Sequence, residues 1–176
     1  VESLRSNTTG SANTASGYKA LFANTTASNN TAVGFYSLCV NTTGTVNTAT
    51  GKDALKSNTT ASFNTGSGYK ALYLNTTGCT NSAFGTEALK KNTTGCRNTA
   101  VGSISLYFNT TGCHNTSTGH QALKCNTTGN DNTAYGYLAL EKNSTASGNT
   151  AHGFGALRQN TTGTGHTAVG HTALHN

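Results

Sequence analysis

The chain has 176 residues and lacks Pro, Met and Trp, and only 9% of its residues are charged, against about 25% in average soluble domains. The apolar fraction is 34%, much of it Ala, which excludes a large core of bulky side chains. The formal charge is +6, but the cations are dispersed along the chain with no run longer than Lys90–Lys91, so we expect no nucleic-acid partner.

No apolar stretch approaches the ~20 residues that a membrane span requires, and no signal peptide is visible. We therefore expect no membrane insertion in this segment. The chain opens at Val1 within a repeat and closes at Asn176 within another. We interpret residues 1–176 as a single repeat array and expect it to be an excerpt of a longer fibre.

A unit of 17 residues repeats along the chain without insertion, and it reads N-T-T-G-x-x-N-T-A-x-G-x-x-A-L-x-x. Its first Asn is called position 1 below. Seventeen residues are too few for a pair of helices, and Asn, Thr and Gly are poor helix formers. Two or three short extended segments per coil, stacked on the next coil by parallel pairing at about 4.8 Å, fit instead. The repeat predicts an all-β fold, a parallel β-solenoid (β-roll or β-helix) of about ten 17-residue coils. Its open strand edges favour end-to-end self-association.

The Asn-Thr-Thr segment at positions 1–3 is also an N-glycosylation acceptor pattern. The candidate glycosylation sites are Asn7, Asn24, Asn41, Asn58, Asn75, Asn92, Asn109, Asn126, Asn143 and Asn160, with Asn29 and Asn115 as two more. Covalent glycans here would indicate a secreted protein. The alternative is an inward Asn ladder that bonds to itself, because sugars on every coil would lie only about 4.8 Å apart.

Rows of Thr raise ice binding as an alternative function. A flat ice-binding face needs two outward Thr ranks that flank an inward residue. Thr8 and Thr9 are adjacent, so strand alternation predicts that they point to opposite sides. Thr14 has an outward neighbour at position 10, but that rank is irregular and includes Ser16, Val33, Phe84, Tyr135 and His152.

Three of the five cysteines, Cys79, Cys96 and Cys113, share position 5 in consecutive coils. Parallel stacking would place their Cα atoms about 4.8 Å apart, inside the range of a disulfide. Only one pair of the three could form, so a small buried thiol ladder is an equal alternative. The chain has no C-x-x-C and no zinc spacing, so we expect neither a metal site nor a cofactor.

Positions 9, 11 and 15 of the unit are expected to form the interior of the rod and one of its corners. Ala at position 9 faces a narrow interior, and Gly at position 11 holds a corner that needs positive φ. Leu at position 15 recurs without exception. The predicted core ladder is Leu21, Leu38, Leu55, Leu72, Leu89, Leu106, Leu123, Leu140 and Leu157.

The segments Asn30–Gly34, Asn98–Gly102 and Asn132–Gly136, each followed by x-x-Ala-Leu or a close variant, carry a family resemblance. They resemble the head repeats of trimeric autotransporter adhesins and related repeats of phage and viral fibres. The resemblance covers essentially the whole chain. It implies a left-handed parallel β-roll, often trimeric, that projects from a surface and adheres.

Few side chains suggest catalysis. Asp53 and Glu87 share a position two coils apart, which would separate them by about 9.6 Å, at the edge of the spacing in inverting glycosidases. A catalytic cleft on a solenoid needs loop insertions, and the repeat has none. We therefore expect no enzymatic activity and no catalytic residues.

Aromatic residues form a loose file at position 12, namely Tyr18, Phe35, Tyr69, Tyr137 and Phe154. They could stack along the rod, contact a neighbouring chain or grip carbohydrate.

Together these patterns predict a structural component of an extracellular or cell- or virion-surface fibre, either a fibril or the shaft or head of an adhesin, with or without a glycan coat. The alternatives are an ice-binding (antifreeze) β-solenoid and a carbohydrate-binding adhesin. The expected partner is the chain itself, end to end or as a trimer.

Overall fold

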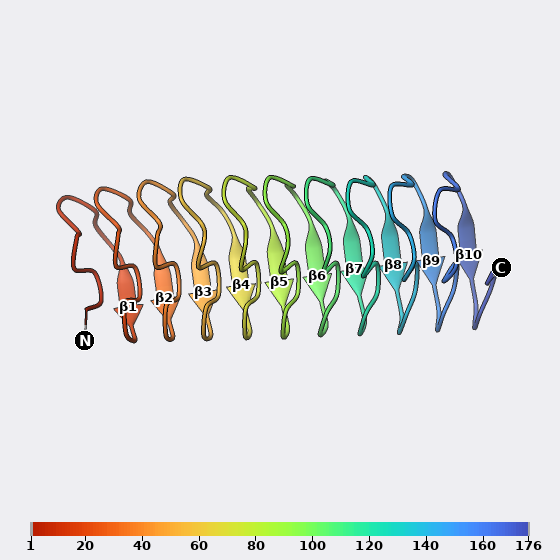
Figure 1. Cartoon of the computed structure of the whole chain (residues 1–176), viewed down its shortest axis with the longest axis horizontal. Coiled ribbons are helices and arrows are strands. Elements are labelled where there is room, and N and C mark those ends of the chain that lie inside the picture. The colour runs from red at the N-terminus through yellow and green to blue at the C-terminus, as the bar shows by residue number, and fades with distance from the viewer. Residues whose placement is uncertain (1, 176) are drawn as a thin grey trace.

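The computed structural model describes residues 2–175 as a row of stacked coils, each with one short strand (Figure 1). The ten strands are three residues long: β1 (Thr14–Ser16), β2 (Thr31–Val33), β3 (Thr48–Thr50), β4 (Thr65–Ser67), β5 (Ser82–Phe84), β6 (Thr99–Val101), β7 (Thr116–Thr118), β8 (Thr133–Tyr135), β9 (Thr150–His152) and β10 (Thr167–Val169). They form one sheet in sequence order. Thr14 pairs with Thr31, in parallel and one unit apart. The predicted parallel β-solenoid is confirmed, and residues 2–175 contain no helix.

Each coil has one strand rather than the two or three extended segments expected. The remaining residues form turns and bends, yet their backbone still bonds to neighbouring coils. The Leu72 amide donates to Ala88 O at 3.0 Å, and the Thr76 amide donates to Thr93 O at 3.0 Å. Coil-to-coil bonding therefore continues well outside the strands.

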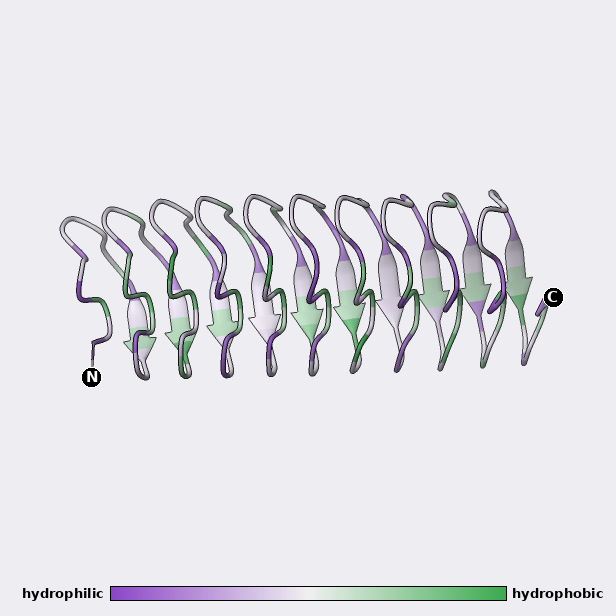
Figure 2. Ribbon diagram, viewed as in Figure 1, coloured by the Kyte–Doolittle hydropathy of each residue, from purple (hydrophilic) through white to green (hydrophobic). Residues whose placement is uncertain are grey.

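The interior has an apolar part made of Leu and Ala. The Leu side chains of position 15 from Leu21 to Leu140 are fully buried, and Leu157 is 3% exposed. Ala at positions 9 and 14 packs against them in one continuous cluster. The hydropathy pattern recurs from coil to coil along the rod (Figure 2). The narrow core explains why small and medium aliphatic side chains suffice.

Positive backbone φ angles recur in every full coil. The position-11 glycines have φ between 124° and 136°, which confirms the predicted corner. The core leucines are also left-handed, with Leu38 at 47° and Leu72 at 52°. This conformation costs a non-Gly residue about 1–2 kcal/mol. Burial of a Leu side chain stabilises the fold by about 1.5–3 kcal/mol, which offsets the backbone strain at the same residue.

A third left-handed site, position 6, lies on the surface and offers a test of this strain. Val46 is 45% exposed and has φ 57°, whereas Gly148 and Gly165 hold the same position at 70°. A β-branched residue is a marked outlier in this region. We expect Val46→Gly to raise the free energy of unfolding by about 0.5–1 kcal/mol, because the relieved strain exceeds the entropy cost of Gly. Urea unfolding measures the change.

The matched control is Val33→Gly. Val33 is similarly exposed at 41% but lies in β2 and has no positive φ. This variant should lose about 0.5–1 kcal/mol. Equal losses in both variants would contradict the assignment of strain to Val46.

Candidate functional site

The ten candidate glycosylation residues at position 1 line the inside of the rod. From Asn24 to Asn143 these side chains are fully buried. Each Nδ2 donates to Oδ1 of the preceding coil's Asn, in nine consecutive steps of 2.7–3.2 Å. Each Nδ2 also donates to the backbone carbonyl of the residue three positions later in the same coil, as Asn75 Nδ2 does to Gly78 O at 2.8 Å. The Asn side chains therefore form a continuous internal ladder.

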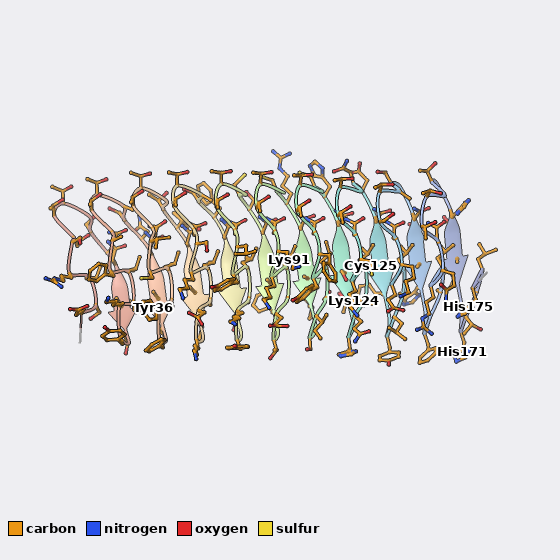
Figure 3. All side chains as sticks on the ribbon, viewed as in Figure 1. Tyr36, Lys91, Lys124, Cys125, His171 and His175 are labelled. Carbon is orange, nitrogen blue, oxygen red and sulfur yellow. The ribbon has the colours of Figure 1, made fainter. Side chains whose placement is uncertain are left out.

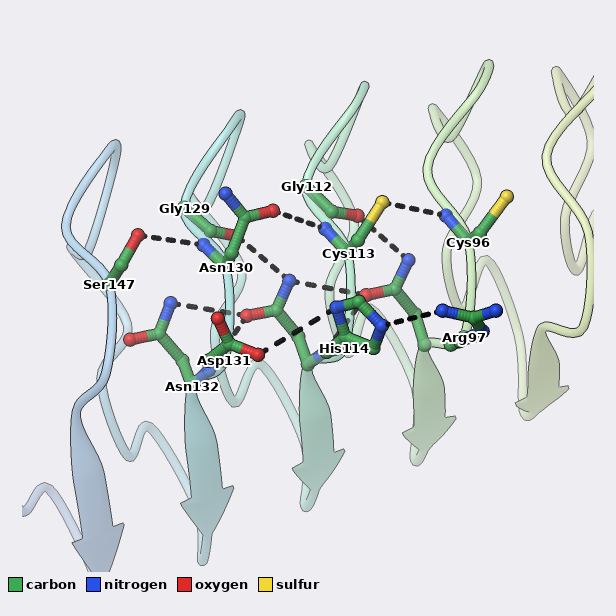
Figure 4. Close-up of polar contacts among 12 residues, drawn as sticks. Cys96, Arg97, Gly112, Cys113, His114, Gly129, Asn130, Asp131, Asn132 and Ser147 are labelled. Carbon is green, nitrogen blue, oxygen red and sulfur yellow. Dashed lines mark hydrogen bonds and ion pairs between the residues drawn. The ribbon is translucent and has the colours of Figure 1, made fainter.

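A second ladder at position 7 serves the backbone. Asn64 Oδ1 accepts the Asn81 amide at 2.9 Å, and Asn64 Nδ2 donates to Gly78 O at 2.9 Å. The ladder continues at Asn132, whose backbone amide and Nδ2 both donate to Asn115 Oδ1, at 3.0 Å and 3.1 Å (Figure 4). Buried polar groups need such partners because an unsatisfied one costs about 1–3 kcal/mol.

Glycosylation of the position-1 residues requires their side chains to point outward. The ladder shows that these side chains lie inside the rod instead. Both hydrogens of each buried amide are used inside the rod, so the folded chain leaves no access for a sugar at these nitrogens. Asn115 is buried in the second ladder. Asn29 differs, because it lies at position 6 and is exposed. Of the other acceptor patterns named from the sequence, Asn7 and Asn160 in the end coils are half-buried and the rest are buried.

The position-5 side chains form a column that accepts backbone amides. The Cys79 amide donates to Cys96 Sγ at 3.0 Å, the Cys96 amide donates to Cys113 Sγ at 3.1 Å, and the Cys113 amide donates to Asn130 Oδ1 at 2.7 Å (Figure 4). Ser147 Oγ accepts the Asn130 amide in the same way. All five cysteines are free thiols. Burial, together with the neighbouring Cys79, raises the pKa of the Cys96 thiol above its usual value, so it is protonated at neutral pH.

The Thr residues of positions 2 and 3 differ in burial. Position 3 is exposed in all ten units, from Thr9 to Thr162, and position 2 is half-buried in the interior coils. The hydroxyl of Thr76 donates to Thr93 O in the next coil at 3.0 Å. This segment is a bend rather than a strand, so the premise of strand alternation does not apply to it. One flank of the rod therefore carries an unbroken outward rank of Thr.

The charged side chains gather on one surface, which we call the charged face and define as positions 12, 13, 16 and 17. It holds ten of the eleven cations and four of the five acids, with Arg97 and Asp131 outside it. Its cations are Arg5, Lys19, Lys52, Lys56, Lys70, Lys90, Lys91, Lys124, Lys142 and Arg158. Figure 3 shows Tyr36, Lys91, Lys124 and His171 distributed along the rod.

Contacts across these four positions make the charged face continuous. Lys19 Nζ lies 5.4 Å from the ring centroid of Tyr18 and 5.1 Å from that of Phe22. Lys56 Nζ lies 4.6 Å from the ring centroid of Tyr36. The sequence did not reveal this face because its cations are far apart along the chain. Counting each cation by its place in the 17-residue unit would have found it.

The aromatic file of position 12 stacks along the rod. The ring centroids of Tyr18 and Phe35 are 5.4 Å apart with planes at 27°, and those of Tyr137 and Phe154 are 5.2 Å apart at 23°. His171 continues the second stack from Phe154 at 4.9 Å and 6°. These pairs realise the stacking alternative, whereas Tyr69 has no stacked ring partner among residues 2–175 and has Lys70 Nζ 5.0 Å from its ring centroid.

Neither carboxylate considered for catalysis is free. Lys56 Nζ lies 3.1 Å from Asp53 Oδ1, and Lys90 Nζ lies 2.7 Å from Glu87 Oε1. Among residues 2–175 no three His, Cys, Asp or Glu side chains gather as a metal site. A hollow lined by Leu157, Asn160, His166 and Leu174 lies at the last coil, where the core is not covered by another coil.

Within residues 2–175 there is also no helix with the length and apolarity to span a bilayer. Comparison with models of protein families, with curated proteins and with solved structures gave no match to this chain.

Proposed function

We propose that the chain is a rigid structural module of an extracellular or surface-attached fibre of a cell or virion, and that it acts without catalysis. The observation that supports this most is the unbroken Asn ladder, which joins ten successive coils through buried side-chain bonds. Each coil contacts its neighbours and no bulky core is needed, so length can be added by repeating the unit. Such a design suits a spacer or shaft.

The sequence resemblance to adhesin heads and viral fibres supports the same proposal in finer terms. A shaft or head would present the charged face and the Thr rank outward while the ladders hold the rod. Self-association, end to end through open coil edges or as a trimer, would extend or bundle the rods. A glycan coat on the position-1 residues is disfavoured, because their amides are internal in the folded chain.

Immunogold electron microscopy of the native source tests the proposal. Antibodies raised against the folded chain should label thin projections on the surface of cells or particles. Purified protein should appear as rods roughly 50 Å long for ten coils. Label confined to the cell interior, away from any filament, would count against a surface fibre even if the rods were observed.

Ice binding is the second candidate, supported by the exposed Thr rank at position 3. All ten side chains of this rank are outward and repeat at the coil spacing. The flanking rank at position 2 is half-buried and bonded to the next coil, which leaves fewer free hydroxyls. Thermal hysteresis of the purified rod is the measurement that separates this candidate from a purely structural one.

A further inference from the structure

The charged face carries all of the chain's net charge. Its ten cations exceed its four acids by the full +6, and the charges of Arg97 and Asp131 outside it cancel. Apart from Arg97 and Asp131, the remaining flanks present neutral side chains, many of them Thr and Ser, with some exposed apolar residues such as Phe63 and Tyr135. A rod with its excess positive charge on one side attracts a negatively charged partner to that side.

Several of these cations have no acidic partner. Glu2, Asp53, Glu87 and Glu141 each lie within 4.0 Å of cations on the charged face. By contrast, four lysines have no carboxylate within that distance in the described part of the chain: Lys52, Lys70, Lys91 and Lys124. They belong to four different coils between residues 41 and 125, so their ammonium groups are spread along the middle of the rod.

The aromatic rings restrict what the partner can be. Single-stranded nucleic acids bind by stacking bases on open ring faces. Here Tyr137 is covered by His120 on one side and Phe154 on the other, at 5.6 Å and 5.2 Å. The stacked rings of this file therefore offer little open face to a base, although Tyr69 has no stacked ring partner among residues 2–175, and charge is the feature of this face that recurs from coil to coil.

The spacing of negative charges along a polyanion distinguishes duplex DNA from acidic polysaccharides as candidate partners. A net +6 along roughly 50 Å gives about one positive charge per 8 Å. Duplex DNA carries one negative charge per about 1.7 Å of its axis, far more than this face can neutralise. A polysaccharide with one carboxylate or sulfate on every one or two sugar rings is a closer match. Lys is also a flexible point charge suited to such spaced anions.

We propose that the charged face binds a linear carboxylated or sulfated polysaccharide that lies along the rod. This inference rests on the proposed surface fibre and names its partner class. It also deepens the carbohydrate-binding alternative, with binding by charge in place of ring stacking.

The test measures binding of the full chain to fluorescent oligosaccharides of polygalacturonate, which carries carboxylates only, and of kappa-carrageenan, which carries sulfates only, by anisotropy at physiological ionic strength. The variant K52Q/K70Q/K91Q/K124Q should lower affinity for the bound polymer at least tenfold. The matched control T26E/T60E/T94E/T128E lowers the net charge by the same four units on the Thr rank, in alternate coils, and should keep affinity within threefold. Circular dichroism and amide exchange verify that both variants keep the solenoid.

Each outcome decides the proposal. Loss with the Lys variant alone supports it, and the two polymers show whether carboxylate or sulfate is preferred. Equal losses in both variants, binding of neutral dextran as tight as that of the charged polymers, tighter binding of a DNA duplex, or no binding of either anionic polymer would overturn it. Failure to bind would leave the rod and its surface location, tested by microscopy, unaffected.

Discussion

Asn75→Ala should lower the free energy of unfolding by about 3–5 kcal/mol, because it removes three buried hydrogen bonds at once. Asn75 Nδ2 donates to Asn58 Oδ1 at 3.0 Å and to Gly78 O at 2.8 Å. Its own Oδ1 accepts from Asn92 Nδ2 at 2.7 Å. The substitution leaves these partners in a dry interior where water cannot replace the lost amide. Urea unfolding gives the total loss.

Amide exchange should locate the loss around the altered coil, since each coil of a repeat protein depends on its nearest neighbours. The control is Thr77→Ala, two residues away and exposed, which should change stability by no more than about 0.5 kcal/mol. Similar losses in the two variants would contradict the role of the ladder.

Asn75→Asp adds a test by pH. Its carboxylate keeps the size of the amide but has no hydrogen to donate, and burial raises the pKa of a carboxyl group above its unfolded value of about 3.9. A raised folded-state pKa gives stability that is present below the unfolded pKa and is lost as the pH rises. The variant should therefore be more stable below about pH 4 than at about pH 7. The opposite trend would show that this position is accessible to water.

The sequence was sufficient for the period, the parallel stacking and the corner glycine, because each follows from strict recurrence at a fixed spacing. The sequence was insufficient to predict the backbone conformation of the residues between the strands. Leu is an ordinary β or helical residue by propensity, so nothing in its side chain signals the left-handed φ of Leu55 or Leu72. Position 6 did carry a signal, because Asn29, Asp131 and Gly148 all tolerate that conformation.

The candidate surface could be predicted only in part. Asn at position 1 satisfies both the glycosylation pattern and an internal ladder, and the pattern of residue types is the same in either case. Only the direction of the side chain distinguishes them, and that depends on the bend at Thr8 and Thr9. The charged face was missed for a different reason, since residues such as Lys52 and Lys70 are neighbours only after the chain has coiled.

The second prediction with a large expected effect on stability concerns the glycines at position 11. Gly119 has φ 134°, and a Cβ atom there would lie 2.4 Å from Gly136 O and 2.7 Å from Gly136 C in the next coil. Backbone atoms cannot turn aside as a flexible side chain can. We expect Gly119→Ala to cost about 2–6 kcal/mol, from strained backbone and overpacking together, with the coils around residues 119–136 the first to lose amide protection.

Gly66→Ala is the matched control, with the same added methyl group and the opposite expected sign. Gly66 lies in β4 at position 9, where the other coils carry Ala or Ser, and its φ is not positive. An added Cβ would lie 3.3 Å from both Leu55 Cγ and Ala71 O. The Leu side chain can relieve the first contact by a small shift, and the second is a far milder approach to backbone than the one at Gly119. The variant should gain about 1 kcal/mol by filling the core and restricting the unfolded chain. If both substitutions destabilised equally in urea, the tight coil-to-coil approach at position 11 would not be what requires glycine there.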